Sequence, residues 1–255
     1  IGDVNMEVKN WTVHHPLYPE RKVCDNVSIK VRKGEVVGIS GLMGAGRTEL
    51  AMSIFGQSYG TNISGQLYLD GKEVHLKTIK QAIKNKLAYV TEDRKGNGLV
   101  LTNPIKINTT LANLDSISPR MIIDKDKEYQ VAEEYRGKLK TKCPTVEQNV
   151  GNLSGGNQQK VLLAKWMFTD PDVLILDEPT RGIDVGAKYE IYCIINDLVA
   201  AGKSVVMISS ELPEVLGMSD RIYVMNEGRI AGELSAEEAS QERIMSIIVS
   251  SGKGA

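Results

Sequence analysis

Residues 173–180 read Val-Leu-Ile-Leu-Asp-Glu-Pro-Thr, and this stretch decides the fold. Its four leading apolar residues predict a buried central strand. Asp177, at the carboxyl end of that strand, can hold the coordination shell of a magnesium ion. Glu178 can orient or deprotonate an attacking water, because phosphoryl transfer needs a positioned nucleophile more than covalent chemistry. A structural strand that merely ends in two acidic residues is the alternative.

A glycine-bearing turn lies upstream of this strand, where residues 153–160 read Leu-Ser-Gly-Gly-Asn-Gln-Gln-Lys. Ser154 and the N–H groups of Gly155 and Gly156 are expected at the start of a helix, where the dipole favours a phosphate. Regular helical structure is predicted over 161–168. A chance turn is the alternative, but the acidic strand that follows favours a phosphate contact.

A second glycine-rich segment, at 41–48, reads Gly-Leu-Met-Gly-Ala-Gly-Arg-Thr. A β-branched run at 36–40 precedes it and helical spacing over 48–55 follows it, which is the context of a phosphate-binding loop. Glycines let successive backbone N–H groups converge on anionic oxygens at a helix start. The expected nucleotide-binding residues are Gly41, Leu42, Met43, Gly44, Ala45, Gly46, Arg47, Thr48 and Glu49.

Arg47 stands where such loops usually carry lysine, and Thr48 offers a hydroxyl suited to Mg²⁺. Arginine keeps the positive charge, but it is planar and forked and cannot take the point-charge position of a lysine. We therefore expect this loop to bind nucleotide with weakened support for transfer of the γ-phosphate. A plain tight turn is the alternative for the loop taken alone.

Short β-branched strands alternate with helices along the chain, which predicts an α/β fold with a mostly parallel sheet covered on both faces. Further strands are predicted at 4–13, 27–31 and 204–209, and hairpins at 65–74 and 221–233. A helix is predicted at 187–201, and another follows residue 209 with Pro213 in its first turn. Residues 104–150 are expected to form a mainly helical insertion.

Composition excludes several classes of protein. The 255 residues are 42% hydrophobic and 25% charged, which is ordinary for a globular chain. The net charge of -1 argues against nonspecific electrostatic binding of nucleic acid. Cys24, Cys143 and Cys193 are far apart, which predicts buried structural thiols in a reducing compartment. No apolar run approaches the ~18 residues of a membrane span, so membrane association is expected to come through a partner.

Together these motifs resemble the nucleotide-binding domain of ATP-binding cassette (ABC) transporters, over essentially the whole chain. The stretches at 41–50, 89–95, 153–161, 174–188 and 209–228 are similar to the second, C-terminal cassette of bacterial monosaccharide-import ATPases of the xylose, ribose, galactose or multiple-sugar type. The resemblance implies a P-loop NTPase with a mostly parallel core sheet, an antiparallel β subdomain and an α-helical subdomain. The implied parts are 1–80 (β subdomain and phosphate loop), 95–155 (helical subdomain), 156–235 (core) and 236–255 (C-terminal helix and tail).

The resemblance also implies a head-to-tail pair of cassettes that encloses ATP and Mg²⁺. Ser154, Gly155, Gly156 and Gln158 would then contact the ATP of the partner cassette, and Asp184 would lie at the interface. The implied partners are a first cassette (fused or dimeric), transmembrane permease subunits and, indirectly, a periplasmic or extracellular sugar-binding protein. The expected place is the cytoplasmic face of the bacterial inner membrane, as a peripheral subunit.

Three positions depart from the family pattern. Arg47 replaces the lysine, Glu92 replaces a glutamine that binds Mg²⁺ alongside Thr48 and Asp177, and Ser210 replaces the switch histidine. All three belong to the site that the cassette's own phosphate loop would form. Losing one transition-state contact typically costs two to three orders of magnitude in rate, so we expect slow hydrolysis at this site.

Other points stay open on the sequence alone. The adenine-stacking residue could be His14, His15 or Tyr18, or this stretch could be a plain surface loop, whereas Trp11 is expected to pack in the β subdomain. The chain begins at Ile1, which suggests a piece of a longer polypeptide. Two other functions are considered: a non-hydrolysing, ATP-gated dimerisation module, and a soluble cassette ATPase of another process.

Overall fold

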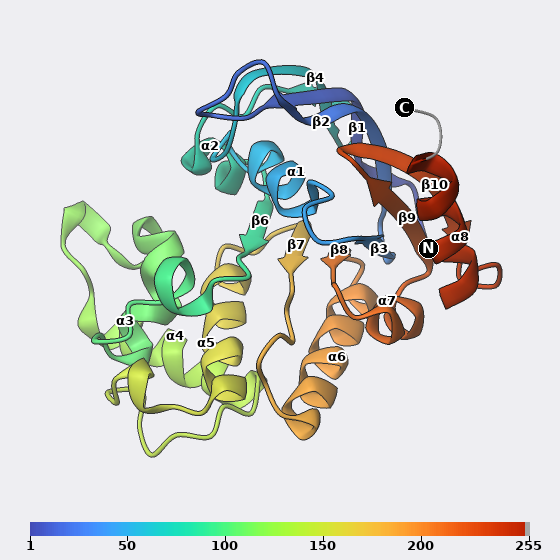
Figure 1. Cartoon of the computed structure of the whole chain (residues 1–255). Coiled ribbons are helices and arrows are strands. Elements are labelled where there is room, and N and C mark those ends of the chain that lie inside the picture. Colours follow the sequence, from blue (N-terminus) through green and yellow to red (C-terminus); the bar gives the residue numbers. More distant parts are fainter. Residues whose placement is uncertain (253–255) are drawn as a thin grey trace. The chain divides into compact units, whose positions relative to one another are not determined.

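The acidic stretch lies in a six-stranded sheet of the computed structural model, which describes residues 1–252 (Figure 1). The strand order is β10-β9-β3-β8-β7-β6. The strands are β3 (Val36–Gly41), β6 (Leu87–Val90), β7 (Val173–Asp177), β8 (Ser204–Ile208), β9 (Arg221–Asn226) and β10 (Arg229–Ser235). β3 pairs in parallel with β8 and β9, β7 pairs in parallel with β8, and only the β9–β10 hairpin is antiparallel among these pairs. The prediction of a mostly parallel sheet is confirmed.

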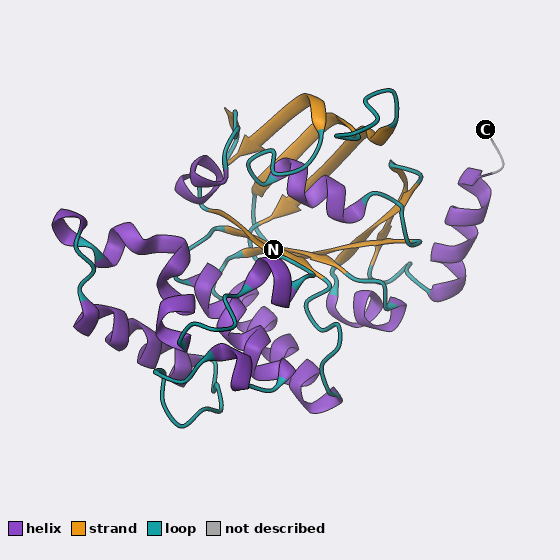
Figure 2. Ribbon diagram, turned by 60° about the vertical axis from the view of Figure 1, so that its left-hand side comes forward, coloured by secondary structure: helices purple, strands orange, loops and turns teal. Residues whose placement is uncertain are grey.

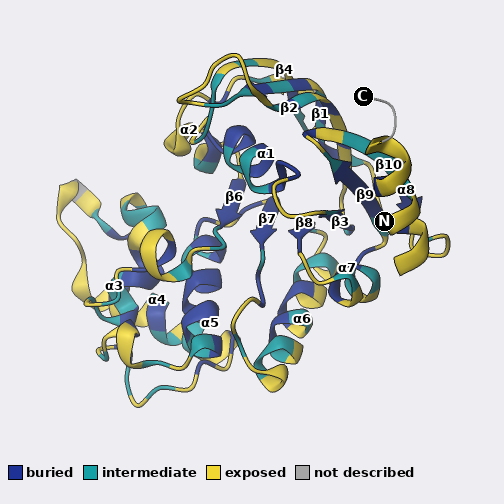
Figure 3. Ribbon diagram, viewed as in Figure 1, coloured by how far each residue is buried: buried dark blue, intermediate teal, exposed yellow. Residues whose placement is uncertain are grey.

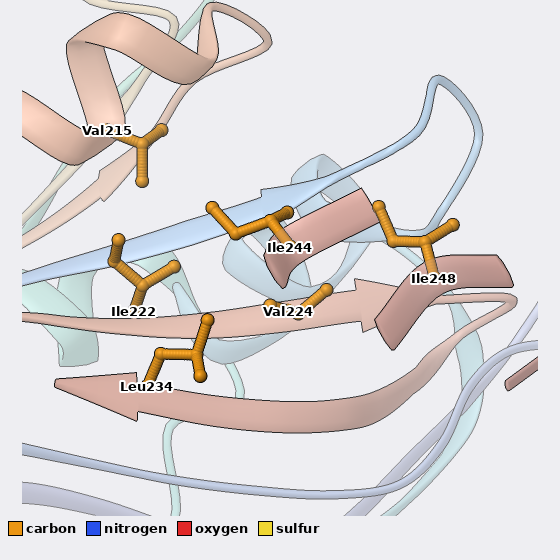
Figure 4. Close-up of a cluster of buried hydrophobic side chains, with 6 residues drawn as sticks. All are labelled: Val215, Ile222, Val224, Leu234, Ile244 and Ile248. Carbon is orange, nitrogen blue, oxygen red and sulfur yellow. The ribbon is translucent and has the colours of Figure 1, made fainter. Parts of the chain in front are cut away.

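The middle strands of this sheet are buried along their whole length, as their continuous apolar sequences predict. Every residue of β7 and β8 is buried (Figure 3). At the β9–β10 edge of the sheet, a hydrophobic cluster is enclosed by these two strands and by α7 (Leu212–Met218) and α8 (Gln241–Ser251) (Figure 4). The cluster consists of Val215, Ile222, Val224, Leu234, Ile244 and Ile248. Pro213 lies in the first turn of α7, as predicted.

A second, antiparallel sheet has the order β2-β1-β4-β5. Its strands are β1 (Val4–His14), β2 (Lys22–Arg32), β4 (Thr61–Leu69) and β5 (Lys72–Val74). The predicted hairpin turn is confirmed, because Asp70 and Gly71 join β4 to β5 with φ angles of 49° and 74°. Both angles suit the turns that match the twist of a hairpin. Trp11 is buried on β1 and its indole donates to Ser53, which confirms its packing role.

Contacts divide the chain into two units. The first comprises Ile1–Tyr89, Asp172–Glu178 and Asn196–Ala255, and the second comprises Val90–Pro171 and Pro179–Ile195. Residues 104–152 of the second unit are helical with connecting loops, which confirms the predicted helical insertion (Figure 2). Its helices are α3 (Ile105–Thr110), η2 (Leu111–Ile117), η3 (Pro119–Met121), α4 (Lys125–Lys138) and η4 (Val150–Asn152). None of the helices in the described part of the chain is long and apolar enough to cross a membrane.

Several boundaries differ from the sequence-based expectation. Helix α5 covers Gly155–Met167 with Ser154 as its N-cap, which confirms that residues 154–156 lie at the start of a helix; the regular helix predicted over 161–168 begins earlier than expected. Glycine has low helix propensity, so the apolar pattern indicated regular helix only from residue 161. Helix α6 (Val185–Ala200) begins at 185 rather than 187. Helix α2 (Ile79–Lys84) and strand β6 had no predicted counterpart, because both are short.

The cysteine prediction is only partly correct. Cys24 is fully buried, Cys143 is half-buried and Cys193 is exposed. Cys193 precedes two buried residues of α6, Ile194 and Ile195, and therefore lies on the polar side of an amphipathic helix. The last three residues of the predicted C-terminal tail, 253–255, lie outside the described residues.

Candidate nucleotide-binding site

The phosphate loop connects β3 to helix α1 (Arg47–Ile54) within the first unit. Gly44 and Gly46 have φ angles of 79° and 95°, which L side chains rarely adopt. A Cβ atom on Gly46 would lie 2.5 Å from the carbonyl oxygen of Val23, so glycine is also required sterically. Gly46 precedes α1 as its N-cap and offers no side-chain cap. The first N–H groups of α1 therefore have no side-chain partner and can bind an anion.

The acidic strand ends beside this loop's helix. Asp177 is fully buried, and its Oδ2 accepts a hydrogen bond of 2.9 Å from the hydroxyl of Tyr89. Burial raises the pKa of Asp177 above its ordinary value, while hydrogen bonds from Thr48 and Tyr89 and the charge of Arg47 oppose that rise. The structure thus brings Thr48 and Asp177 together, as the sequence predicted for two groups that share a cation.

The oxygens of this pair suit magnesium. Asp177 Oδ1 is buried and has no hydrogen-bond partner within the described chain. Mg²⁺ prefers carboxylate and hydroxyl oxygens and usually takes one or two protein ligands together with phosphate oxygens and water. A cluster of three or more His, Cys, Asp or Glu side chains placed for a metal does not occur in residues 1–252. The ion would therefore depend on Thr48, Asp177 and the phosphates of a bound nucleotide.

Glu178 occupies a strained position at the end of β7. Its φ angle is 48°, in the left-handed region, and its N–H donates to the carbonyl of Ile208 at 2.8 Å. Strain of this kind is concentrated at functional sites. The hydroxyl of Ser210 donates to Glu178 Oε2 at 3.0 Å, and Arg47 Nη2 lies 3.9 Å from Glu178 Oε1. Two of the three residues that depart from the family pattern thus contact the candidate general base.

Arg47 extends from α1 toward the end of β8 and is buried there. Its Nη1 donates to the carbonyl of Ser209 at 2.8 Å, and its Nη2 forms the ion pair with Glu178. Ser209 is itself buried and its hydroxyl donates to Glu214. The cation that replaces the usual lysine is therefore engaged by a carbonyl and by the candidate base of the same unit.

The turn at 154–156 lies in the second unit. Ser154 is the N-cap of α5, but its hydroxyl does not cap the helix. Instead it accepts a hydrogen bond of 2.9 Å from Asn157 Nδ2, and Asn157 Oδ1 accepts one of 2.8 Å from the backbone N–H of Lys142. This second bond fixes the orientation of the amide. Because Asn157 donates to it, the Ser154 hydroxyl is free to donate its own hydrogen outward.

A pocket of about 250 Å³ opens beside this turn. Ser154, Gly156 and Asn157 line it together with the start of α6. A Cβ atom on Gly156 would lie 2.4 Å from the Cβ of Ala187, so the two helices meet closely at this glycine. The arrangement leaves an exposed serine at an uncapped helix start, which can bind a phosphate.

Gln158 does not lie on this surface. Its side chain is 4% exposed and donates to the carbonyl of Val150 at 3.3 Å. In this structure its amide supports the turn from inside, and the contact of Gln158 with a partner's ATP stays a prediction. A helix rotates by about 100° per residue, so Gln158 points inward although Asn157 before it is only half-buried.

Two further predicted residues are engaged within the second unit. Asp184 accepts a hydrogen bond of 2.9 Å from the N–H of Ala187 and so caps the start of α6. Glu92 forms an ion pair with Arg181, so its carboxylate contacts the loop that leads to Asp184. The assignment of Glu92 to a metal ion stays a prediction.

The three adenine candidates differ in their surroundings. His14 contacts the carbonyl of Pro19, and His15 Nδ1 accepts from the N–H groups of Leu17 and Tyr18. Both histidines therefore hold the loop together. Tyr18 is 57% exposed, and its ring centroid lies 5.2 Å from that of His15. Of the three, Tyr18 has the ring most accessible to a ligand.

Sequence reasoning missed several residues of the site. Tyr89 bonds to Asp177, and Asn157 orients Ser154, although both belong to stretches that carried the resemblance. Cys24 lies beneath the phosphate loop with its thiol 3.6 Å from the carbonyl of Gly46. Nothing in a linear pattern signals these contacts, because each joins residues from separate segments or depends on a side-chain direction.

Comparisons with known proteins identify the family of the chain. The profile of the ABC transporter family matches residues 24–181. The chain is 60% identical to the L-arabinose transport ATP-binding protein AraG of Geobacillus stearothermophilus, over 97% of this chain and 48% of that protein. It is 57% identical to the xylose import ATP-binding protein XylG of Thermoanaerobacter pseudethanolicus, over 96% of this chain and 48% of that protein. The chain thus spans about half the length of these relatives.

Solved structures share the fold. A nucleotide-free ATP-binding cassette from an ABC transporter superposes with a TM-score of 0.78 at 22% identity, over 98% of this chain and 97% of that one. The ADP conformation of the ATP-binding cassette MJ1267 superposes with a TM-score of 0.76 at 25% identity, over 97% and 99%. The cassette fold expected from the motifs is confirmed.

Proposed function

Because this chain belongs to the ABC transporter family, we propose that it binds ATP with Mg²⁺ and energises the import of a monosaccharide. The printed functions of similar proteins support the substrate class: they transport L-arabinose, import xylose and import ribose. The chain spans 48% of the length of each, so the proposal concerns a protein that contains this cassette and a further part. It would act at the cytoplasmic face of the inner membrane, docked on permease subunits that receive sugar from a binding protein.

We further propose that the chain is the second cassette of a pair and that its own site hydrolyses ATP slowly. The observation that carries this proposal is the engagement of Arg47 with Ser209 and Glu178. In this position the guanidinium neutralises the candidate base and does not extend along the phosphate loop. Ser210 occupies the other oxygen of Glu178 but cannot take up and release a proton near neutral pH, as a histidine can.

The turn at 154–156 would complete the site of the first cassette. Its helix start is uncapped and the Ser154 hydroxyl is oriented by Asn157. The backbone N–H groups and this hydroxyl can therefore donate hydrogen bonds to a phosphate bound by the other cassette. Bound ATP supplies the phosphoanhydride whose cleavage drives transport, and Mg²⁺ neutralises part of its charge. The residues of this chain bind, orient and exclude water around that nucleotide.

The alternative of a non-hydrolysing dimerisation module has one specific observation in its favour. Both oxygens of Glu178 already have partners in this structure, Ser210 and Arg47. On this alternative the own site binds ATP only to close the pair. The two functions differ in the ATP turnover that remains when the turn at 154–156 is disabled. Slow hydrolysis at the chain's own site leaves residual turnover, whereas a non-hydrolysing module leaves none.

The test uses the intact polypeptide that carries this chain, reconstituted with its permease in vesicles. Ser154→Arg places a bulky cation in the turn and is expected to abolish nearly all ATP turnover. Arg47→Ala is expected to reduce turnover by less than about tenfold, because the main catalytic site lies elsewhere. Ser250→Arg, at an exposed serine of α8, is the control for the same substitution. Nearly complete loss in Arg47→Ala with little loss in Ser154→Arg contradicts the proposed asymmetry.

A further inference from the structure

Arg94, a residue that the proposed function does not use, lies directly behind the turn at 154–156. It begins the short helix η1 (Arg94–Gly98) of the second unit. Its Nη1 donates to Gln159 Oε1 at 3.4 Å. A Cβ atom on Gly155 would lie 3.3 Å from Arg94 Nη2, so the guanidinium packs against the backbone of the turn. The absence of a side chain at Gly155 permits this close approach.

The charge of Arg94 has no counter-ion among the described residues. Its Nε is buried and donates to no acceptor within the described chain, and none of its nitrogens lies within ion-pair distance of a carboxylate in that part of the protein. Lys160 of α5, by contrast, has a counter-ion. Its buried ammonium pairs with Glu190 at 2.7 Å and donates to the carbonyl of Lys140. Burial also lowers the pKa of Arg94 from its ordinary value, with no carboxylate to oppose it.

An unpaired cation that is partly removed from water costs free energy unless an anion compensates it. The turn in front of Arg94 is built to receive an anion. The helix start is uncapped, and Ser154 is exposed with its hydroxyl oriented by Asn157. Because the guanidinium packs against the backbone at Gly155, Arg94 acts on such an anion through its electric field and through the position of the turn.

We propose that Arg94 is a positioning residue for the turn at 154–156, where its positive charge stabilises the terminal phosphate of a nucleotide presented by another cassette. This inference rests on the proposed function, which assigns that nucleotide to the turn. The segment at 92–94 also joins two other segments. Glu92 pairs with Arg181 on the loop before α6, while Arg94 bonds to Gln159 on α5. A displacement of the segment at 92–94 would therefore move both segments that face the nucleotide.

The test compares Arg94→Gln, Arg94→Lys and Lys95→Gln in the intact, reconstituted transporter. Arg94→Gln keeps a donor but removes the charge, Arg94→Lys keeps the charge, and Lys95→Gln removes the same charge from an exposed neighbour. We expect Arg94→Gln to lower the kcat for ATP about tenfold, since the charge acts through one intervening residue. Arg94→Lys is expected to retain activity within about threefold, and Lys95→Gln within about twofold.

Thermal unfolding separates an electrostatic role from a structural one. Removing an uncompensated charge does not weaken the nucleotide-free fold, so Arg94→Gln is expected to change its Tm by no more than about 2 °C. Equal losses of kcat in Arg94→Gln and Arg94→Lys, together with a clearly lowered Tm in both, would overturn the proposal and leave Arg94 a packing residue.

Ser154→Arg, measured in the same assay, distinguishes the two levels of inference. Loss of turnover in Ser154→Arg with full turnover in Arg94→Gln refutes the role of Arg94 and leaves the proposed function intact. Full turnover in Ser154→Arg removes the partner-directed role of the turn, and the inference about Arg94 falls with it.

Discussion

The phosphate loop at 41–48 and the turn at 154–156 both present the uncapped start of a helix, but their polar side chains are disposed in opposite ways. In the phosphate loop's unit, Arg47 is buried and is already bonded to Ser209. In the turn, the Ser154 hydroxyl is exposed and only its acceptor side is used. A helix start alone therefore does not define an active site. What distinguishes the two regions is whether the nearby charged and hydroxyl groups are already engaged by the protein.

The two regions also differ in what their glycines do. Gly46 adopts a φ of 95° beneath the carbonyl of Val23, so it allows a backbone conformation. Gly156 has ordinary helical backbone, and its missing side chain allows α5 and α6 to approach each other. Four predictions test this comparison, beginning with the largest expected effect.

Gly46→Ala is expected to be the most damaging of these changes. The new methyl group would lie 2.5 Å from Val23 O in a backbone region that disfavours L residues. We expect a loss of about 3 kcal/mol in unfolding free energy and loss of Mg²⁺-dependent ATP binding at this loop. Gly44→Ala is the matched control, because Gly44 has a similar φ of 79° but no atom within 4 Å of its Cβ position. It should cost about 1 kcal/mol. Denaturant titration and equilibrium ATP binding measure both, and equal losses would contradict the steric argument.

Gly156→Ala is expected to lower the free energy of unfolding by about 2 kcal/mol, because its Cβ would lie 2.4 Å from that of Ala187. Nucleotide binding at the phosphate loop should be unaffected, since the clash is confined to the second unit. The double variant with Ala187→Gly should recover most of the lost stability. A double-mutant cycle measured by denaturant titration gives the coupling. Additive losses would show that the two helices do not meet at this glycine.

The variant Asp177→Asn tests the effect of this carboxylate on folding stability separately from its effect on Mg²⁺-dependent ATP binding. Burial raises the pKa of Asp177, so its contribution to stability is present at low pH and is lost as pH rises through the folded pKa. The asparagine variant has no such loss. Its stability relative to the native chain should therefore increase as pH rises from about 4 to 7, reaching about +1 kcal/mol.

The same variant should lose the effect of Mg²⁺ on ATP affinity, because the amide cannot replace the carboxylate as a magnesium ligand. Thermal unfolding across this pH range, with and without MgATP, measures both effects. A variant that is less stable than the native chain at pH 7 would refute the sign of the argument.

Thiol labelling gives the smallest perturbation. Burial raises the pKa of Cys24 to about 12, and its thiol contacts Gly46 beneath the phosphate loop. Cys193 is exposed. At pH 8 a thiol reagent should modify Cys193 within minutes and leave Cys24 unmodified until the chain unfolds. Peptide mass spectrometry identifies the modified residue. Rapid labelling of Cys24 in the folded protein would show that the phosphate loop opens.

Much of the fold followed from local patterns. The continuous apolar run before Asp177 is stable only when both faces of the strand are buried, so β7 was predictable. The Asp70-Gly71 pair suits a tight turn, so the β4–β5 hairpin was predictable as well. The start of α5 at residues 154–156 was predicted as well, but the close approach of Gly156 to Ala187 was not, because it joins two separate segments. The burial of Gln158 was not predicted either, and its contact with a partner's nucleotide stays a prediction.

The sequence by itself determined the family of this protein, and it predicted the place of a phosphate loop and the positions at which residues depart from the family pattern. These properties depend on residue type and spacing along the chain. Only the tertiary structure decided that Arg47 reaches Glu178, that Asn157 orients Ser154 and that Arg94 lies behind Gly155 with no carboxylate partner among residues 1–252. The reason is physical: the direction of a long or polar side chain depends on the partners that other segments bring within hydrogen-bond distance, and linear order does not specify them.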